Sequence, residues 1–198
     1  MRRLIFLLEE YSIKVLLDGL IPRLFPDLPF LCVPHEGKHD LEKSIPRKLK
    51  SWREPGVRFV VVRDNDGGDC MALKEKLEAL CREGCREDSI VRIACQEIEA
   101  WYFGDPEALA EAFGRDDLRC LCSKKRYRDP DAIIQPGKAI EELVPEFQKV
   151  SGARRMVSLL SRERNRSRSF HVLLESIERA AMEMRDRDAD EEPRRNTS

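Results

Sequence analysis

The chain lacks an apolar stretch long enough to cross a bilayer, and it has almost no net charge. Its 198 residues carry 36 basic and 37 acidic side chains, so attraction to nucleic acid or to a membrane surface has to come from local patches. The two arginines at the start precede only five apolar residues, too few for a secretory signal. We therefore expect a cytoplasmic protein with no membrane partner.

Disulfide, zinc and nucleotide-binding motifs are also missing. The seven cysteines are odd in number and scattered, which argues against a disulfide framework. Neither Cys81 with Cys85 nor Cys120 with Cys122 has the CxxC spacing typical of a structural zinc site, so zinc is not favoured. The chain has no GxxxxGK[ST] loop, and any ATPase it works with has to be a separate protein.

The most informative segment is a strand that ends in acids. Four apolar β-formers, Phe59–Val62, predict a strand buried on both faces. Asp64, Asp66 and Asp69 follow at once, with a glycine pair that allows a sharp turn, and Asp69 is placed to cap the next helix. Three carboxylates at one strand end repel one another, so the pattern predicts a divalent cation, Mg²⁺ or Mn²⁺, that joins them.

Acidic residues follow the other predicted strands as well. Apolar runs at 4–8, 29–33 and 90–95 end, respectively, at Glu9 and Glu10, at His35 and Glu36, and at Glu97 and Glu99. Residues 12–25 and 40–52 have helical character between these runs. This alternation predicts an α/β fold with a largely parallel sheet flanked by helices. All four strand ends then meet at one edge, which is where such sheets bind ligands.

The organisation changes beyond residue 104. We expect an α/β domain over 1–104 and a C-terminal helical appendage over 105–184, because the later apolar residues have helical spacing and form no further convincing strand. The segment 185–198 has almost no apolar residues and is expected to be disordered.

Basic clusters mark the helical appendage. Cations beside an acidic metal edge suit a phosphodiester substrate, since they bind the backbone while the metal acts on one phosphate. A solvated charged surface is the alternative explanation, because 37% of all residues are charged. The candidate nucleic-acid-binding residues are Lys124, Lys125, Arg128, Lys149, Arg154 and Arg166.

Two resemblances extend this interpretation. A strand ending in Glu9 and a later strand ending in Asp64-x-Asp66 resemble the Toprim domain of topoisomerases, primases and nucleases of the overcoming-lysogenization-defect (OLD) type. Over residues 1–175 the chain also resembles an uncharacterised bacterial family, a domain of unknown function. That likeness rests on the motifs Glu9-Glu10, His35-Glu-Gly-Lys38, Arg63-Asp-Asn-Asp-Gly-Gly-Asp69, Ile93-Ala-Cys-Gln-Glu97, Glu99-Ala-Trp101, Gln148-Lys149 and Arg166-Ser-x-Ser-Phe170.

The Toprim resemblance implies a Toprim or Rossmann-like sheet and a set of roles. Asp64 and Asp66 would hold Mg²⁺ or Mn²⁺, and Glu9 would share that ion, complete a second site or take a proton from the attacking water. Glu97 and Glu99 are candidates for a second metal or for positions around the first. Glu10, His35 and Asp69 would surround the ligands. The expected function is a metal-dependent DNA or RNA phosphodiesterase, in a bacterial defence or repair complex.

Two other classes of function remain open. A phosphoacceptor receiver domain also has acids after its first and third strands, but it needs a hydroxyl after the fourth strand and a lysine after a fifth, and neither is evident. A non-catalytic Toprim-like adaptor would bind a separate ABC-type ATPase, as OLD-type nucleases work with one in the same chain. The sequence does not distinguish DNA from RNA and leaves the oligomeric state open.

Overall fold

Four apolar strands form one parallel sheet in the order β2-β1-β3-β4. The computed structural model describes the backbone of residues 2–195 and the side chains of residues 2–188. The strands are β1 (Arg3–Leu8), β2 (Phe30–Pro34), β3 (Val57–Asp64) and β4 (Ile90–Ala94). Each strand coincides with an apolar run of the sequence, and the predicted parallel, Rossmann-like α/β class is confirmed.

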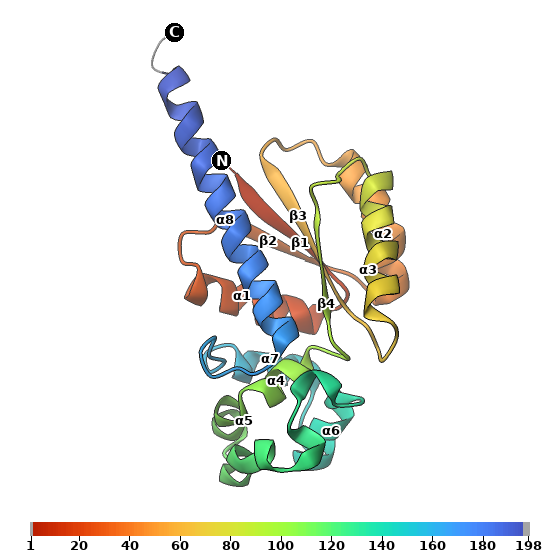
Figure 1. Ribbon diagram of the computed structural model, residues 1–198, viewed down its shortest axis with the longest axis vertical. Coiled ribbons are helices and arrows are strands. Elements are labelled where there is room, and N and C mark those ends of the chain that lie inside the picture. The colour runs from red at the N-terminus through yellow and green to blue at the C-terminus, as the bar shows by residue number, and fades with distance from the viewer. Residues whose placement is uncertain (1, 196–198) are drawn as a thin grey trace.

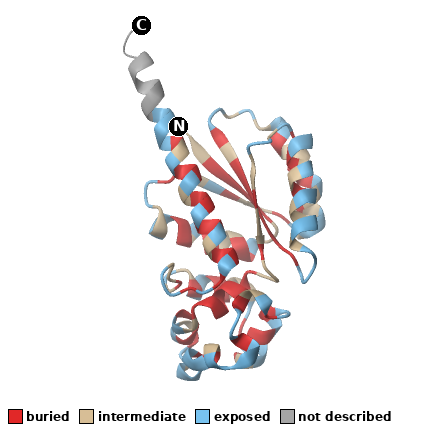
Figure 2. Cartoon of the chain, in the orientation of Figure 1, coloured by how far each residue is buried: buried red, intermediate tan, exposed pale blue. Residues whose placement is uncertain are grey.

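Helices cover both faces of this sheet (Figure 1). Along β1, Leu4 and Phe6 belong to one buried cluster, whereas Ile5 and Leu7 belong to another, as the alternation of side chains along a strand requires. Both faces of the sheet are therefore covered, and the strands contain many buried residues (Figure 2). The first cluster faces α1 (Tyr11–Leu24) and α8 (Arg168–Arg195), and the second faces α2 (Lys38–Ser51) and α3 (Cys70–Glu83).

The strand order reverses between β1 and β3. The chain leaves β1 through α1 on one face to reach β2, and it leaves β3 through α3 on the other face to reach β4. Helices that depart to opposite faces open a crevice between the carboxyl ends of two neighbouring strands, and ligands of open α/β sheets bind in that crevice. Glu9 and Asp64 stand at this point.

The helical region, from α4 onward, lies along the carboxyl edge of the sheet, and its last helix, α8, then packs across one face of the sheet (Figure 1). One buried cluster contains Phe6 of β1, Trp101 of α4 and Leu174 of α8, so the expected appendage shares a core with the sheet. Within the described residues, no helix combines the length and apolar content needed to span a membrane. The elements are α4 (Glu99–Gly104), α5 (Pro106–Phe113), the 3-10 helices η1 (Asp116–Ser123), η2 (Lys125–Tyr127) and η3 (Pro130–Ala132), α6 (Pro136–Leu143) and α7 (Lys149–Met156).

Helix α8 continues through Arg195, where composition predicted disorder from residue 185. The prediction weighed only the lack of apolar residues. An established helix extends cheaply, however, because each further residue other than proline adds one hydrogen bond, and Ala, Arg and Glu have high helix propensity. Asp188 also forms a 2.8 Å ion pair with Arg2 at the start of the chain. Residues 196–198 lie outside the described part.

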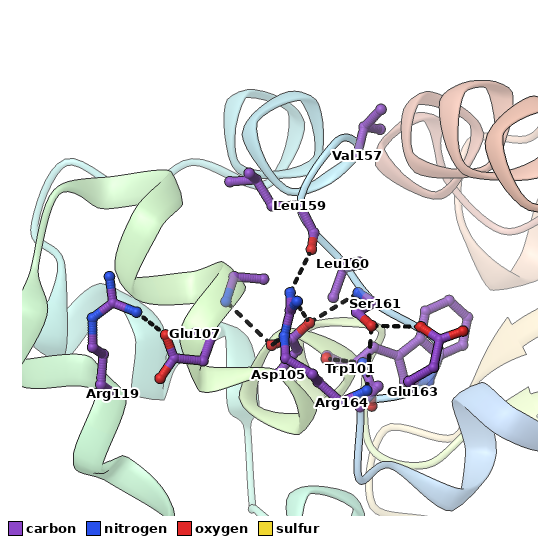
Figure 3. A network of polar contacts seen from close by, with 12 residues as sticks. Trp101, Asp105, Glu107, Arg119, Val157, Leu159, Leu160, Ser161, Glu163 and Arg164 are labelled. Atoms are coloured by element: carbon purple, nitrogen blue, oxygen red, sulfur yellow. Dashed lines mark hydrogen bonds and ion pairs between the residues drawn. The ribbon is translucent and has the colours of Figure 1, made fainter.

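A buried carboxylate joins the helical region to the loop that precedes α8 (Figure 3). Asp105 is fully buried, caps α5 by accepting the Ala108 N–H at 3.2 Å, and accepts the Ser161 N–H at 2.9 Å. Arg164 donates to both of its oxygens, at 3.1 and 3.0 Å. A bidentate guanidinium satisfies a buried carboxylate well, so this network has a structural role. No local sequence pattern identifies this network.

Candidate functional site

Asp64, the last residue of β3, is a buried acid at the strand-order reversal. The residue is 3% exposed, and its Oδ1 has no hydrogen-bond partner among the described residues. Burial raises the pKa of Asp64 well above its usual value, and the nearby negative charges of Glu99 and Glu9 raise it further. The β3 strand thus places a carboxylate where water cannot solvate it.

Glu99, the first residue of α4, is buried even more completely. It has no exposed surface, and neither carboxylate oxygen has a partner within residues 2–188. Burial raises its pKa to about 7, although the positive charge of Lys149 opposes the increase. One turn along α4, the hydroxyl of Tyr102 is also buried without a described partner, and burial followed by the charges of Glu99 and Asp64 raises the pKa of Tyr102 well above its usual value.

Glu9 connects the first strand to this acidic group. Its Oε2 accepts a hydrogen bond from the backbone N–H of Asp64 at 3.2 Å and lies 3.7 Å from Nε of Arg63. Burial, followed by the negative charge of Asp66, raises the pKa of Glu9. Arg63 is itself held by an ion pair with Glu42 on α2, so Glu9 has a cation on one side and acids on the other.

Glu10 diverges from Glu9. Its Oε1 accepts a hydrogen bond from the hydroxyl of Ser12 and lies 3.4 Å from the ammonium nitrogen of Lys149 on α7. The β1–β3 pairing ends at Leu8 with Val62, so Glu9 and Glu10 lie just beyond the strand, and their separate partners show that the two side chains diverge. Both acids flank the site, with Glu9 on the Arg63 side and Glu10 on the Lys149 side.

The turn after Asp64 holds Asp66 and Asp69 in different environments. Asp66 has a left-handed backbone, with φ of 50°, and its exposed carboxylate forms a 3.2 Å ion pair with Lys38. Asp69 accepts the N–H groups of Met71 and Ala72 at 2.8 and 3.2 Å, so the predicted helix cap is confirmed. Both residues are exposed, and Asp66, whose negative charge acts on Glu9, is the ligand candidate nearer to the buried acids.

Glu97 and His35 contact backbone groups at the rim of the site. Glu97 Oε2 accepts the N–H of Gly137, at the start of α6, at 2.7 Å. His35 Nδ1 lies 2.9 Å from the carbonyl oxygen of Leu8, and burial lowers the pKa of its ring. His35 thus supports the end of β1, and Glu97 connects the turn before α4 to the start of α6.

The six basic candidates separate into two groups. Lys149 lies against the acids, whereas the other five are exposed. Arg166 donates to the backbone carbonyl of Arg128 at 3.0 Å, which brings two of the predicted clusters together. The side chains that remain available on the surface are those of Lys124, Lys125, Arg128, Arg154 and Arg166.

The serines of the Arg166-Ser-x-Ser-Phe170 motif stabilise the start of α8. Ser167 Oγ accepts the N–H of Phe170 at 3.2 Å, and Asp131 accepts the N–H of Ser169 at 3.0 Å. Both serine hydroxyls donate to Asp131, and the Trp101 indole donates to the Ser169 hydroxyl at 2.9 Å. These contacts satisfy the free amides of a helix N-terminus. The two serines of the motif therefore serve to cap α8.

The acids of the site carry the oxygen donors that divalent cations prefer, but they do not form a preassembled metal site. No three acidic, histidine or cysteine side chains of residues 2–188 converge closely enough to hold a metal ion as they stand. Asp64 and Glu99 nevertheless offer three buried oxygens without described partners, and hard divalent cations prefer carboxylate oxygens. Without a cation, burial and mutual repulsion favour the protonated carboxyls, and proton loss and cation binding are coupled.

Comparison with known proteins gives a family and no assigned activity. No curated protein matches the chain, and no solved structure matches it. Residues 8–178 match the family described as a domain of unknown function, DUF4276. That span begins just before Glu9 and ends within α8, so it contains every candidate site residue. The chain belongs to the DUF4276 family.

Proposed function

We propose that this protein is a cytoplasmic, divalent-metal-dependent phosphodiesterase that cleaves DNA or RNA. The observation that carries the proposal is the pair Asp64 and Glu99, two buried carboxylates that act electrostatically on each other beside the strand-order reversal. Oδ1 of Asp64 and both carboxylate oxygens of Glu99 lack described partners. Burying unpaired negative charge is costly. A fold that retains it at a ligand-binding edge has a use for a cation there.

Asp64 is the central ligand of the proposed site. Glu9 and Asp66 lie on one side of it and Glu99 on the other, and together these four acids would hold Mg²⁺ or Mn²⁺. The ion would supply positive charge that polarises a phosphate oxygen. Glu9 already accepts a hydrogen bond from the Asp64 N–H. If Glu9 does not bind the ion directly, its carboxylate would take a proton from the attacking water.

Exposed cations on the helical region support a nucleic-acid substrate. Lys124, Lys125, Arg128, Arg154 and Arg166 are exposed, and Arg166 reaches the backbone at Arg128. Lysine and arginine contacts to phosphates bind a strand without reading its sequence. The Toprim pattern of Glu9, Asp64 and Asp66 favours the same chemistry and a bacterial defence or repair role.

Incubation with nucleic acids tests this proposal. Purified protein is mixed with supercoiled plasmid, linear DNA or RNA, in Mg²⁺, Mn²⁺ or EDTA. We expect cleavage of at least one substrate with a divalent ion and none with EDTA. Equal cleavage in EDTA, or no cleavage of any substrate, would contradict the proposal.

The Lys149–Glu10 ion pair favours a second candidate function. The ammonium group of Lys149, 3.4 Å from Glu10, partly neutralises the acids without any metal. An ion-pair network of this kind can serve the fold alone. The protein would then be a non-catalytic adaptor for a separate ABC-type ATPase. Mn²⁺ titration distinguishes the two, since an adaptor has no reason to bind Mn²⁺ through Asp64 and Asp66.

A further inference from the structure

Lys149 brings a positive charge into the acidic site from a distant part of the chain. It is the first residue of α7, and its Nζ lies 3.4 Å from Oε1 of Glu10, 139 residues earlier. Burial disfavours its charged form, but the carboxylates of Glu99, Glu10 and Asp64 outweigh burial and raise the pKa of Lys149. The side chain is therefore an ammonium ion across the physiological pH range.

The packing of α7 fixes the position of this ammonium. Helix α7 contacts α1, and Gly19 of α1 lies so close to Val157 that an added methyl group would overlap it. Arg23 of α1 donates to the carbonyl oxygen of Val157 at 3.2 Å. An added methyl group at Gly152 would likewise overlap the ring of Phe147. The backbone that carries Lys149 is thus held against the helix that follows Glu10.

The charges divide the site into two sides. On the Glu9 side, Arg63 is engaged by Glu42 and the Lys38–Asp66 ion pair is exposed to solvent, with side chains 46% and 43% exposed. On the Glu10 side, the buried carboxylate of Glu99 has no described hydrogen-bond partner, and Lys149 is the cation that acts on it most strongly. Lys149 therefore places a positive charge on the Glu10 side of the site, next to Glu10 and within electrostatic reach of Glu99.

We propose that Lys149 supplies the second positive charge of the site, so that the protein binds one divalent cation and not two. This inference rests on the proposed metal-dependent function. In two-metal sites the ions lie about 3.5–4 Å apart and share carboxylates. An ammonium ion beside Glu10 and Glu99 repels a second cation from those same carboxylates.

Mn²⁺ binding to the full-length protein tests the number of cations. Stoichiometry is measured by calorimetric titration and by electron paramagnetic resonance, which detects spin coupling between neighbouring Mn²⁺ ions. We expect the wild type to bind one Mn²⁺ per chain without coupling. K149M and K149Q should bind two, with coupling, whereas K149R should bind one because it keeps the charge.

Exposed Lys50 on α2 provides the matched control, since K50M removes the same charge away from the site and should bind one Mn²⁺. Two coupled Mn²⁺ ions in the wild type would overturn the inference, as would a single ion in folded K149M and K149Q. Absence of Mn²⁺ binding in the wild type and in all variants would instead remove the proposed metal site, and the inference with it. Circular dichroism confirms that each variant is folded.

Discussion

The carboxylate of Glu9 accepts a hydrogen bond from the backbone N–H of Asp64 at 3.2 Å. This contact joins the residue after β1 to the last residue of β3, across the point where the strand order reverses. Two acids from separate strands are thereby held together, although their charges repel. Glu10, the next residue, engages Ser12 and Lys149 instead.

The divergence of Glu9 and Glu10 predicts different effects of the same substitution. Glu9→Gln should reduce metal-dependent cleavage by about 100-fold or more, because it removes a charged ligand or proton acceptor next to Asp64. Glu10→Gln is the matched control and should retain nearly full activity, since Lys149 keeps other acidic neighbours. Cleavage rates on a single substrate compare the two. The opposite ranking would assign the ligand role to Glu10.

Substitution of the two aspartates separates function from stability. Asp64→Asn and Asp66→Asn should each abolish metal-dependent cleavage. Asp64→Asn should leave the metal-free protein equally or more stable, because it removes a buried charge that Glu99 and Glu9 repel. Urea unfolding without metal measures the stability. A destabilised Asp64→Asn protein that still cleaves would show that the residue serves the fold.

The raised pKa of Glu99 predicts how the free energy of unfolding depends on pH. Burial raises its pKa from 4.5 to about 7, so the folded state binds this proton more tightly than the unfolded state. The Glu99 contribution is full below pH 4.5 and is lost as pH rises toward about 7, which lowers the free energy of unfolding by about 3 kcal/mol.

Glu99→Gln removes that contribution and should flatten the pH dependence of the metal-free protein. Some slope should remain, because the pKa values of Asp64 and Glu9 are raised in the same direction. Chemical denaturation between about pH 5 and about pH 8 measures the difference between the two proteins. Identical pH profiles would mean that Glu99 titrates normally.

Local sequence patterns predicted the sheet and its acidic edge, because apolar runs such as Phe59–Val62 define strands and acids such as Asp64 follow them. They did not predict the partners that depend on tertiary packing. The basic clusters mark Lys149 as a candidate contact for nucleic acid, and they do not show that the packing of α7 on α1 places it beside Glu10. Asp105 carries no local signal of its contact with Arg164, 59 residues later. Helical periodicity shows which side of a helix is buried and gives no information about what covers it.

The exposed basic cluster predicts the salt dependence of binding. Replacing Lys124, Lys125 and Arg128 with alanine removes up to three phosphate contacts, and each contributes about −0.9 to the slope of log affinity against log salt on duplex DNA. The variant should bind more weakly at low salt, with a shallower slope and unchanged Mn²⁺ affinity.

A matched control for this cluster is available on α2, where Lys43, Arg47 and Lys50 are also exposed. Their triple alanine variant should bind as the wild type does. Unchanged affinity and slope in the Lys124 cluster variant would mean that the cluster is only a solvated surface. The substrate path would then involve Arg154 and Arg166, or a partner protein.

An anomalous difference map from crystals grown with Mn²⁺ tests the central claim most directly, because it locates the ion without requiring a substrate. We expect a Mn²⁺ peak at about 2.1 Å from a carboxylate oxygen of Asp64, comparable to the distance at which carboxylates hold Mg²⁺. Crystals of Asp64→Asn should lack this peak. A fully occupied peak elsewhere, or none at Asp64 in the wild type at saturating Mn²⁺, would contradict a metal-dependent phosphodiesterase built on this edge.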